Sequence, residues 1–275
     1  MVKRVAAIHD LAGIGRCSLT VITPVISAMG IQCCPVPTAI LSTHTGGYTG
    51  FSFLDMTEEL KRYIRHWKEL NERFDAIYTG FLGSAEQISL VDNFITDFNH
   101  DECLLMVDPV LGDNGKAYAT CDAVLCGKMY ELAKRADILV PNLTEAAILL
   151  GEDYSSAPSD EEGLENWLRR LSDLGPKQIV LTGLNEGKDK LKVAIFDKSV
   201  GSAEFLYGTK VGGDYPGTGD IFASVLLGGL LNGGTLSECT RKSMDFVHDS
   251  VKFTYEAGTT PREGILVEPM LKYLM

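Results

Sequence analysis

The most informative stretch of the chain spans residues 213–227 and reads GDYPGTGDIFASVLL. Its glycine-rich half runs directly into an apolar segment that predicts a helix, and one carboxylate, Asp220, stands at the junction. Gly217 and Gly219 allow a tight turn because they carry no Cβ atom. The first amides of a helix have no partners within the helix, so they can bind an anion such as phosphate. Asp220 could accept a proton from a hydroxyl that attacks this phosphate, or it could simply cap the helix.

Composition limits the classes of protein to which the chain can belong. Its 275 residues, 45% hydrophobic and 23% charged, predict a single soluble domain over residues 1–275. The net charge of −12 and the lack of a basic tract argue against nucleic acid or an anionic membrane as a partner. We expect no signal peptide and no membrane span, because the apolar runs are too short. The seven scattered cysteines, without a C-x-x-C pair, predict reduced thiols in a cytoplasmic protein.

Short apolar runs alternate with amphipathic stretches along most of the chain. Parallel strands are predicted at 5–9, 32–39, 76–80, 104–107, 138–140 and 179–182. Helices are predicted at 16–29, 57–70, 84–98, 121–135, 143–150, 160–174, 220–232 and 237–255. Two further strands, 193–196 and 203–207, are predicted to be antiparallel around a turn. This α/β order predicts a doubly wound, mostly parallel central sheet with helices on both faces, and ligands that bind beyond the carboxyl ends of the strands.

Carboxylates follow the predicted strands at this edge of the sheet. They are Asp108, Asp113 and Glu145, in addition to Asp220. Carboxylates beside a phosphate-binding turn suit Mg²⁺, which bridges one or two carboxylates and the phosphates of a nucleotide. Each also has a structural explanation, as a strand end, a turn residue or a first-turn helix acid. Their shared position at one edge favours the binding site.

Other nucleotide and hydrolase motifs are absent from the sequence. There is no G-x-x-x-x-G-K-[ST], G-x-S-x-G or H-E-x-x-H, and Ser18 replaces the third glycine of G-x-G-x-x-G. His44 lies in a polar, glycine-bearing segment that could flank a pocket, although a lone histidine there is more often a surface or satisfied residue than a catalyst.

The combined motifs resemble those of the ribokinase-like superfamily and, within it, the pyridoxal/pyridoxamine (vitamin B6) kinases. The resemblance rests on GTGD at 217–220, DPVLGD at 108–113, PNLTE at 141–145, GFLGSAEQ at 80–87 and STHTG at 42–46. These motifs occur in the order of the family and extend over most of the chain. GTGD marks the superfamily, whereas DPVLGD and GFLGSAEQ point to the vitamin B6 kinases.

This resemblance implies ATP-dependent phosphorylation of the 5′-hydroxymethyl group of pyridoxal, pyridoxine or pyridoxamine by a commonly homodimeric enzyme with small flap and lid elements. Asp220 would be the general base, and the amides of Gly217, Thr218, Gly219 and Asp220 would stabilise the transferring phosphoryl group. Further implied roles are substrate contacts from Asp10, His44, Thr45 and Phe81, nucleotide contacts from Asp113, Tyr118, Asn142, Glu145, Thr182 and Gly183, and Mg²⁺ binding by Asp108, Asp113 and Glu145. A monovalent cation, K⁺, would lie near Asp108.

The sequence departs from the family pattern at three places. His9 and Asp10 stand at the end of the first predicted strand, where members often have Gln-Ser. A buried carboxylate there could pair with a cationic group of pyridoxamine or pyridoxine. Phe81 replaces a frequent tyrosine, and Val140 replaces a threonine near the expected monovalent cation.

Two other functions remain open. A hydroxymethylpyrimidine kinase of thiamin metabolism would also phosphorylate a CH₂OH group on a small heteroaromatic ring. Those kinases usually have a G-S-D-x-x-G-G-A-G type of segment after the first strand, whereas this chain has HDLAGIGR at 9–16. The other alternative is a non-catalytic homologue that binds pyridoxal or a nucleotide, and such a protein would not need Asp220 as a base.

Overall fold

The computed structural model describes residues 2–187 and 189–275. Its strands are β1 (Arg4–Ile14), β2 (Gln32–Thr43), β3 (Phe53–Asp55), β4 (Ala76–Thr79), β5 (Leu104–Val107), β6 (Gly112–Asp113), β7 (Lys116–Ala117), β8 (Ile138–Leu139), β9 (Gln178–Glu186), β10 (Lys190–Asp197) and β11 (Ala203–Thr209). Its α-helices are α1 (Leu19–Ala28), α2 (Thr57–Glu69), α3 (Ala85–Phe98), α4 (Ala123–Ala133), α5 (Leu143–Leu150), α6 (Glu161–Leu174), α7 (Thr218–Leu231) and α8 (Leu236–Glu256).

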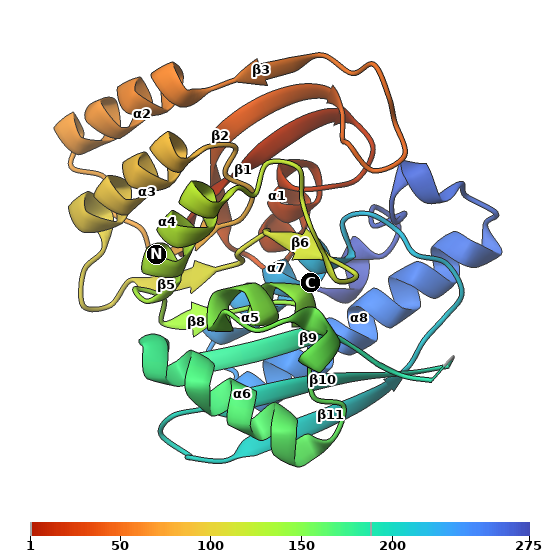
Figure 1. The fold of residues 1–275 in the computed structure, drawn as a ribbon. Helices are drawn as coiled ribbons and strands as arrows, with labels where there is room; N and C mark the ends of the chain where they lie inside the picture. The colour runs from red at the N-terminus through yellow and green to blue at the C-terminus, as the bar shows by residue number, and fades with distance from the viewer. Residues whose placement is uncertain (1, 188) are drawn as a thin grey trace.

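One central sheet organises the molecule (Figure 1). Among the described residues it has nine strands in the order β11-β10-β9-β8-β5-β4-β1-β2-β3. Strands β9, β8, β5, β4, β1 and β2 run parallel to one another, whereas the pairs β2–β3, β9–β10 and β10–β11 are antiparallel. The predicted α/β fold with a mostly parallel sheet is therefore confirmed. None of the helices in the described ranges is long and apolar enough to cross a bilayer.

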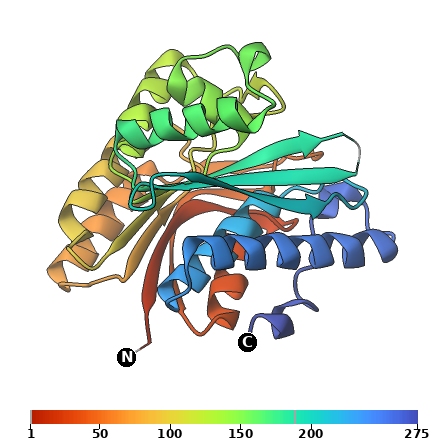
Figure 2. The same cartoon turned by 90° about the horizontal axis from the view of Figure 1, so that it is seen from below.

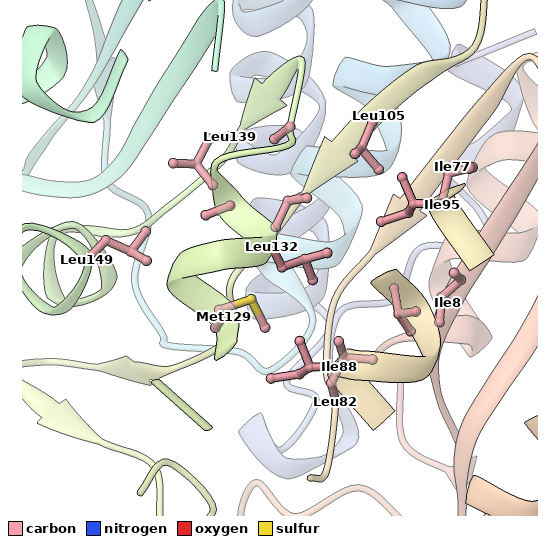
Figure 3. Packing of buried hydrophobic residues seen from close by; sticks show 14 of the residues in the cluster. Ile8, Ile77, Leu82, Ile88, Ile95, Leu105, Met129, Leu132, Leu139 and Leu149 are labelled. Carbon is pink, nitrogen blue, oxygen red and sulfur yellow. The ribbon is translucent and has the colours of Figure 1, made fainter. Parts of the chain in front are cut away.

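Helices cover both faces of this sheet (Figure 2). Helices α2 to α6 pack on one face, and α1, α7 and α8 pack on the other. In the first layer, Ile8, Ile77 and Leu105 of the sheet meet Ile95 of α3 and Leu132 of α4, as Figure 3 shows. All five side chains are at most 1% exposed, and burial of apolar surface of this kind is the main force that holds the layers together. Because the parallel strands are covered on both faces, they are apolar without alternation.

The first strand is longer than predicted. The polar pair His9-Asp10 suggested that this strand ends at residue 9, but β1 continues to Ile14 and pairs with β2 as far as Thr43. The register between the two strands shifts between His9 and Leu11, where β2 has one residue more than β1. Asp10 therefore lies at an irregularity inside the strand and not at its end. The short β3 pairs with the extended part of β2 at residues 39–41.

The start of α7 also differs from the prediction. The helix begins at Thr218, and its N-cap is Gly217 with φ 84°, in the left-handed region that glycine tolerates. Asp220 is thus the third residue of the helix, and the alternative in which it acts as the N-cap is wrong. Its carboxylate belongs to the first helical turn, where a negative charge interacts favourably with the helix dipole.

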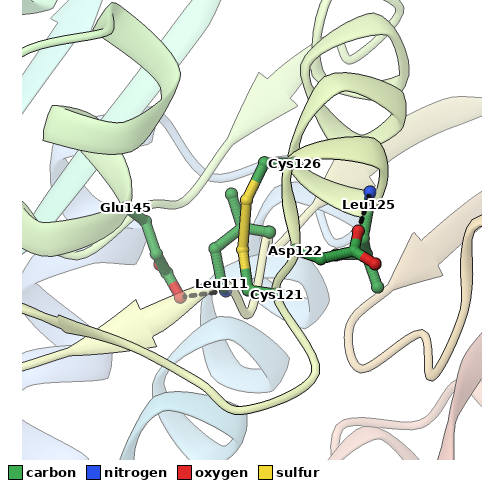
Figure 4. Close-up of a disulfide and its surroundings, with 6 residues drawn as sticks. All are labelled: Leu111, Cys121, Asp122, Leu125, Cys126 and Glu145. Atoms are coloured by element: carbon green, nitrogen blue, oxygen red, sulfur yellow. Dashed lines mark hydrogen bonds between the residues drawn. A yellow bond between two sulfur atoms is a disulfide. The ribbon is translucent and has the colours of Figure 1, made fainter.

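The prediction that all the cysteines are free thiols is wrong for one pair. Cys121 and Cys126 form a disulfide with their Cα atoms 6.0 Å apart, as Figure 4 shows. Asp122 caps α4 by accepting the Leu125 N–H at 2.8 Å, and this turn brings the two cysteines together. A separation of five residues across a helix cap is not a recognised disulfide pattern, so the sequence did not suggest the bond.

Candidate active site

The carboxylate of Asp220 is held by the turn that precedes α1. The backbone N–H of Ser18 donates to Asp220 Oδ2 at 2.8 Å, and the thiol of Cys17 donates to the same oxygen at 3.4 Å. Gly217 lets the two turns approach, since a Cβ atom at this position would lie 2.2 Å from the carbonyl oxygen of Arg16. The first turn of α7 and the segment before α1 therefore form one unit around Asp220.

The environment of Asp220 makes it a stronger base than an ordinary aspartate. Its pKa is raised to about 6, chiefly by burial and also by the negative charge of Asp10, while the Ser18 N–H opposes the shift. The group is thus largely ionised at neutral pH and still has a raised affinity for a proton. This combination suits a general base, whose efficiency is highest when its pKa lies near the working pH.

Asp10 lies close enough to Asp220 to influence its pKa, and its side chain is only 7% exposed. Burial raises the pKa of Asp10, whereas hydrogen bonds from the Ser18 side chain and from the backbone lower it. The Ser18 N–H binds Asp220, and Ser18 also forms a β-bridge with Leu11, the residue directly after Asp10. Ser18 itself has φ 52°, an uncommon value for a residue with a Cβ atom.

His44 is buried near this pair of acids, with 3% of its surface exposed. Its Nδ1 accepts the Gly46 N–H at 3.0 Å, and its Nε2 lies 2.8 Å from the carbonyl oxygen of Arg262. Since Nδ1 is an acceptor, Nε2 must carry the proton and the ring must be neutral. The ring fills the space beside Gly15, where a Cβ atom would lie 2.1 Å from the imidazole. Both nitrogens are therefore already bonded to the backbone.

The other two predicted substrate residues differ in burial. Thr45 is exposed, directly after His44. Phe81 is half-buried beyond the end of β4, and its carbonyl oxygen accepts the Thr38 hydroxyl at 2.9 Å.

The predicted nucleotide residues come together at the N-terminus of α5. Asn142 caps this helix in a capping box with Glu145, and its Nδ2 donates to the Gly112 carbonyl at 2.8 Å. Asn142 also forms a bridge with Thr182, and Gly183 packs against it with φ 73°. Gly112, Asn142 and Thr182, which belong to three different segments of the chain, thus meet at one edge of the sheet.

Glu145 is almost fully buried, with 3% of its surface exposed. Its Oε1 accepts the Leu111 N–H at 3.1 Å (Figure 4), and its Oε2 accepts the Asn142 N–H at 2.9 Å. Burial raises its pKa to about 8, and the backbone N–H donors oppose this shift. Both carboxylate oxygens therefore have backbone partners, and Glu145 fastens the DPVLGD loop to α5.

Asp113 and Tyr118 lie on the small hairpin of β6 and β7, and both are exposed. The turn residues Asn114 and Gly115 have φ 50° and 74°, as a two-residue hairpin turn requires. The Gly115 N–H donates to Thr144 Oγ1 at 2.9 Å, which joins the hairpin to α5. The hairpin thus provides an exposed carboxylate and an exposed ring beside the cap of α5.

Asp108 is electrostatically coupled to both parts of the site, the turn around Asp220 and the cap of α5 around Glu145. Burial raises its pKa, and the charges of Glu145 and Asp220 raise it further, so it lies within electrostatic range of both. Within the described ranges, no three His, Cys, Asp or Glu side chains are grouped as metal ligands. The carboxylate chemistry still fits Mg²⁺, which keeps several waters and takes oxygens from substrate phosphates. The assignment of Asp108, Asp113 and Glu145 to a metal stays a prediction.

Sequence reasoning missed three residues that shape the site. Cys17 and Ser18 contact Asp220 across 203 and 202 positions of the chain, and no local pattern reports such a contact. Gln87, the last residue of GFLGSAEQ, is fully buried. It accepts the Gly83 N–H at 2.8 Å and donates to the Thr38 carbonyl at 2.8 Å. This motif residue therefore braces the strand–helix turn that carries Phe81.

The doubly wound sheet, with a glycine turn that places an aspartate in the first turn of a helix, defines a ribokinase-like kinase. The chain belongs to the phosphomethylpyrimidine kinase family, whose sequence profile matches residues 24–263. The expected resemblance to vitamin B6 kinases and the expected phosphotransferase class are confirmed.

Individual relatives agree with this assignment. A candidate phosphomethylpyrimidine kinase from Bacteroides thetaiotaomicron, crystallised with pyridoxal, is 43% identical with a TM-score of 0.95, and the alignment covers 100% of this chain and 96% of that one. Pyridoxal kinase from Lactobacillus plantarum is 30% identical with a TM-score of 0.92, over 100% of this chain and 97% of that one. Pyridoxal kinase PdxY of Vibrio campbellii is 27% identical over 241 residues, which are 84% of this chain and 80% of the relative.

Proposed function

We propose that the chain transfers the γ-phosphoryl group of ATP to the 5′-hydroxymethyl group of a B6 vitamer, namely pyridoxal, pyridoxine or pyridoxamine. The observation that carries this proposal is the Asp220 carboxylate in the first turn of α7, held by the Ser18 N–H and with its pKa raised to about 6. The relative crystallised with pyridoxal and the pyridoxal kinases among the relatives support this choice of substrate.

In this mechanism Asp220 accepts the proton of the substrate hydroxyl. The hydroxyl oxygen attacks the γ-phosphorus, a new O–P bond forms, and the bond to the β–γ bridging oxygen breaks so that ADP leaves with the electron pair. The transition state of phosphoryl transfer is loose, so the proton leaves late and a carboxylate of moderate basicity suffices. The amides of residues 217–220 would bind the transferring group at the helix N-terminus, where they need no reorganisation.

The nucleotide would lie along the edge formed by the β6–β7 hairpin, the cap of α5 and Thr182-Gly183. Asn142 and Glu145 would act mainly by fixing this edge, since the structure commits their polar atoms to the backbone. Asp113 and Tyr118 are exposed and free to contact the nucleotide. Asp108, Asp113 and Glu145 would hold Mg²⁺, which would neutralise phosphate charge there, and K⁺ would lie near Asp108. We also expect a cytoplasmic homodimer, which light scattering of the purified protein would test for its oligomeric state.

A second candidate substrate is hydroxymethylpyrimidine, which the description of the matched family favours. The same base and anion site would serve either alcohol. A coupled assay of ADP release with MgATP, run over the three B6 vitamers and hydroxymethylpyrimidine, decides between them. The proposal expects turnover of at least one vitamer with a higher kcat/KM than that of the pyrimidine. Turnover of the pyrimidine alone would assign the second function, and no turnover of any alcohol would leave the non-catalytic alternative.

A further inference from the structure

Asp10 is a buried carboxylate without a counter-ion. Only 7% of its surface is exposed, and burial raises its pKa. Within residues 2–187 and 189–275, no lysine, arginine or histidine nitrogen lies within 4.0 Å of its oxygens. The groups that lower its pKa are the Ser18 hydroxyl and its own backbone, which are neutral, and His44. Buried carboxylates are normally paired with a cation, so this arrangement calls for an explanation.

The histidine that could act on Asp10 does not supply the missing charge. A positive charge on His44 would lower the pKa of Asp10, but its Nδ1 accepts the Gly46 N–H, and this hydrogen-bond geometry corresponds to a neutral ring, which we take as the decisive observation. The two arginines of the surrounding segments are also engaged elsewhere. Arg16 pairs with Glu268 at 2.7 Å, and the Arg262 guanidinium stacks over the Tyr48 ring at 5.4 Å.

A second carboxylate makes the imbalance larger. The charge of Asp10 raises the pKa of Asp220, Leu11 directly after Asp10 forms a β-bridge with Ser18, and the Ser18 N–H binds Asp220, so the two acids lie near one another. Two neighbouring carboxylates repel, and each one disfavours the ionised form of the other. A cationic group of a bound ligand would relieve this repulsion and supply the counter-ion that Asp10 lacks.

We infer that Asp10 selects a substrate that carries a cationic aminomethyl group next to its hydroxymethyl group, which among the B6 vitamers is pyridoxamine. This inference rests on the proposed function. The 4′-substituent is attached to the ring carbon adjacent to the one that bears the 5′-hydroxymethyl group. When the hydroxyl lies at Asp220, the 4′-group is therefore the nearest substituent to reach the neighbouring carboxylate. An ammonium group donates three hydrogen bonds, whereas the corresponding groups of pyridoxine and pyridoxal are neutral.

The test compares pyridoxamine with pyridoxine in the wild type, Asp10→Asn and Asp10→Ser. The values of kcat/KM are measured at saturating MgATP and pH 8. At this pH Asp220 is ionised both in the wild type and in the two Asp10 variants. Asp101→Asn, an exposed acid that we place outside the site, controls for the change in net charge. We expect both Asp10 variants to lower the pyridoxamine-to-pyridoxine ratio by about tenfold or more, mainly through the KM of pyridoxamine, as for the loss of a charged contact.

An unchanged ratio in both variants overturns the inference, and so does an equal loss of kcat/KM for the two vitamers. Neither result would affect the proposed function, since the wild type would still phosphorylate them. Titration calorimetry with each vitamer provides a readout that does not depend on turnover. In that measurement, tighter binding of pyridoxamine that is lost in Asp10→Asn supports the inference, and equal binding of the two vitamers overturns it.

Discussion

Replacement of Asp220 by asparagine separates the catalytic use of this carboxylate from its cost to stability. Asparagine has the same shape and keeps a carbonyl oxygen that can accept the Ser18 N–H. It has no charge and cannot take a proton from the substrate. We therefore expect Asp220→Asn to lower kcat by about 10²–10⁴-fold, as for the loss of a general base, and at the same time to stabilise the fold.

The stability gain follows from the pKa of Asp220. Folding raises it from 3.8 to about 6, chiefly through burial. A shift of about 2 units corresponds to about 3 kcal/mol above pH 6. The favourable interaction of the Asp220 anion with the dipole of α7 offsets about 0.3–1 kcal/mol of this cost of burying the charge. The remaining gain of about 2 kcal/mol is equivalent to a rise in Tm of about 4 °C for a chain of this size.

The dependence on pH has a definite sign. Because the folded state binds the Asp220 proton more tightly than the unfolded state, this group favours folding most at low pH. That contribution is lost as the pH rises from about 4 to about 6. The Tm advantage of Asp220→Asn should consequently be small at pH 4 and complete at pH 8. Thermal melts of both proteins across this range measure it, with Asp101→Asn as the surface control. An asparagine variant that melts at or below the wild type at pH 8 would refute the argument that burial dominates the energy of Asp220.

Three further predictions concern the same site. The kcat/KM of the wild type should rise with pH through an inflection near 6 to a plateau, since only ionised Asp220 accepts a proton, and Asp10→Asn should move this inflection to lower pH; a pH-rate profile with no inflection between 5 and 7 in the wild type would contradict it. Gly217→Ala should reduce kcat by about 10²-fold or more, because its Cβ would lie 2.2 Å from the Arg16 carbonyl and displace the anion-binding turn; kinetics equal to wild type would show that the turn is dispensable. Gln87→Leu should destabilise the fold by about 1–3 kcal/mol in urea unfolding, because it leaves the Gly83 N–H without a partner, whereas the Thr38 carbonyl keeps the Met56 N–H; an unchanged midpoint would contradict this role of Gln87.

The sequence was sufficient for the fold class. Apolar runs such as residues 104–107 and 179–181, separated by amphipathic segments, predicted a parallel sheet with helices on both faces, because strands covered on two sides must be apolar throughout. Element limits were less predictable where polar site residues lie inside strands. Asp10 and Thr182 suggested strand ends, yet β1 and β9 continue past them with an irregular register. In both places a polar residue is kept within a strand beside the site.

The residues of the site were also visible in the sequence, as carboxylates and glycines at one edge of the predicted sheet. Their roles were not, because a role depends on contacts between remote segments. Only the tertiary structure shows that the Ser18 N–H holds Asp220, that Asp10 lies beside it without a cation, and that His44 is neutral. It also shows that Cys121 and Cys126 are bonded. Local patterns record turns, caps and periodicity, which span a few residues, whereas burial and electrostatic coupling arise only when segments some 200 residues apart pack together.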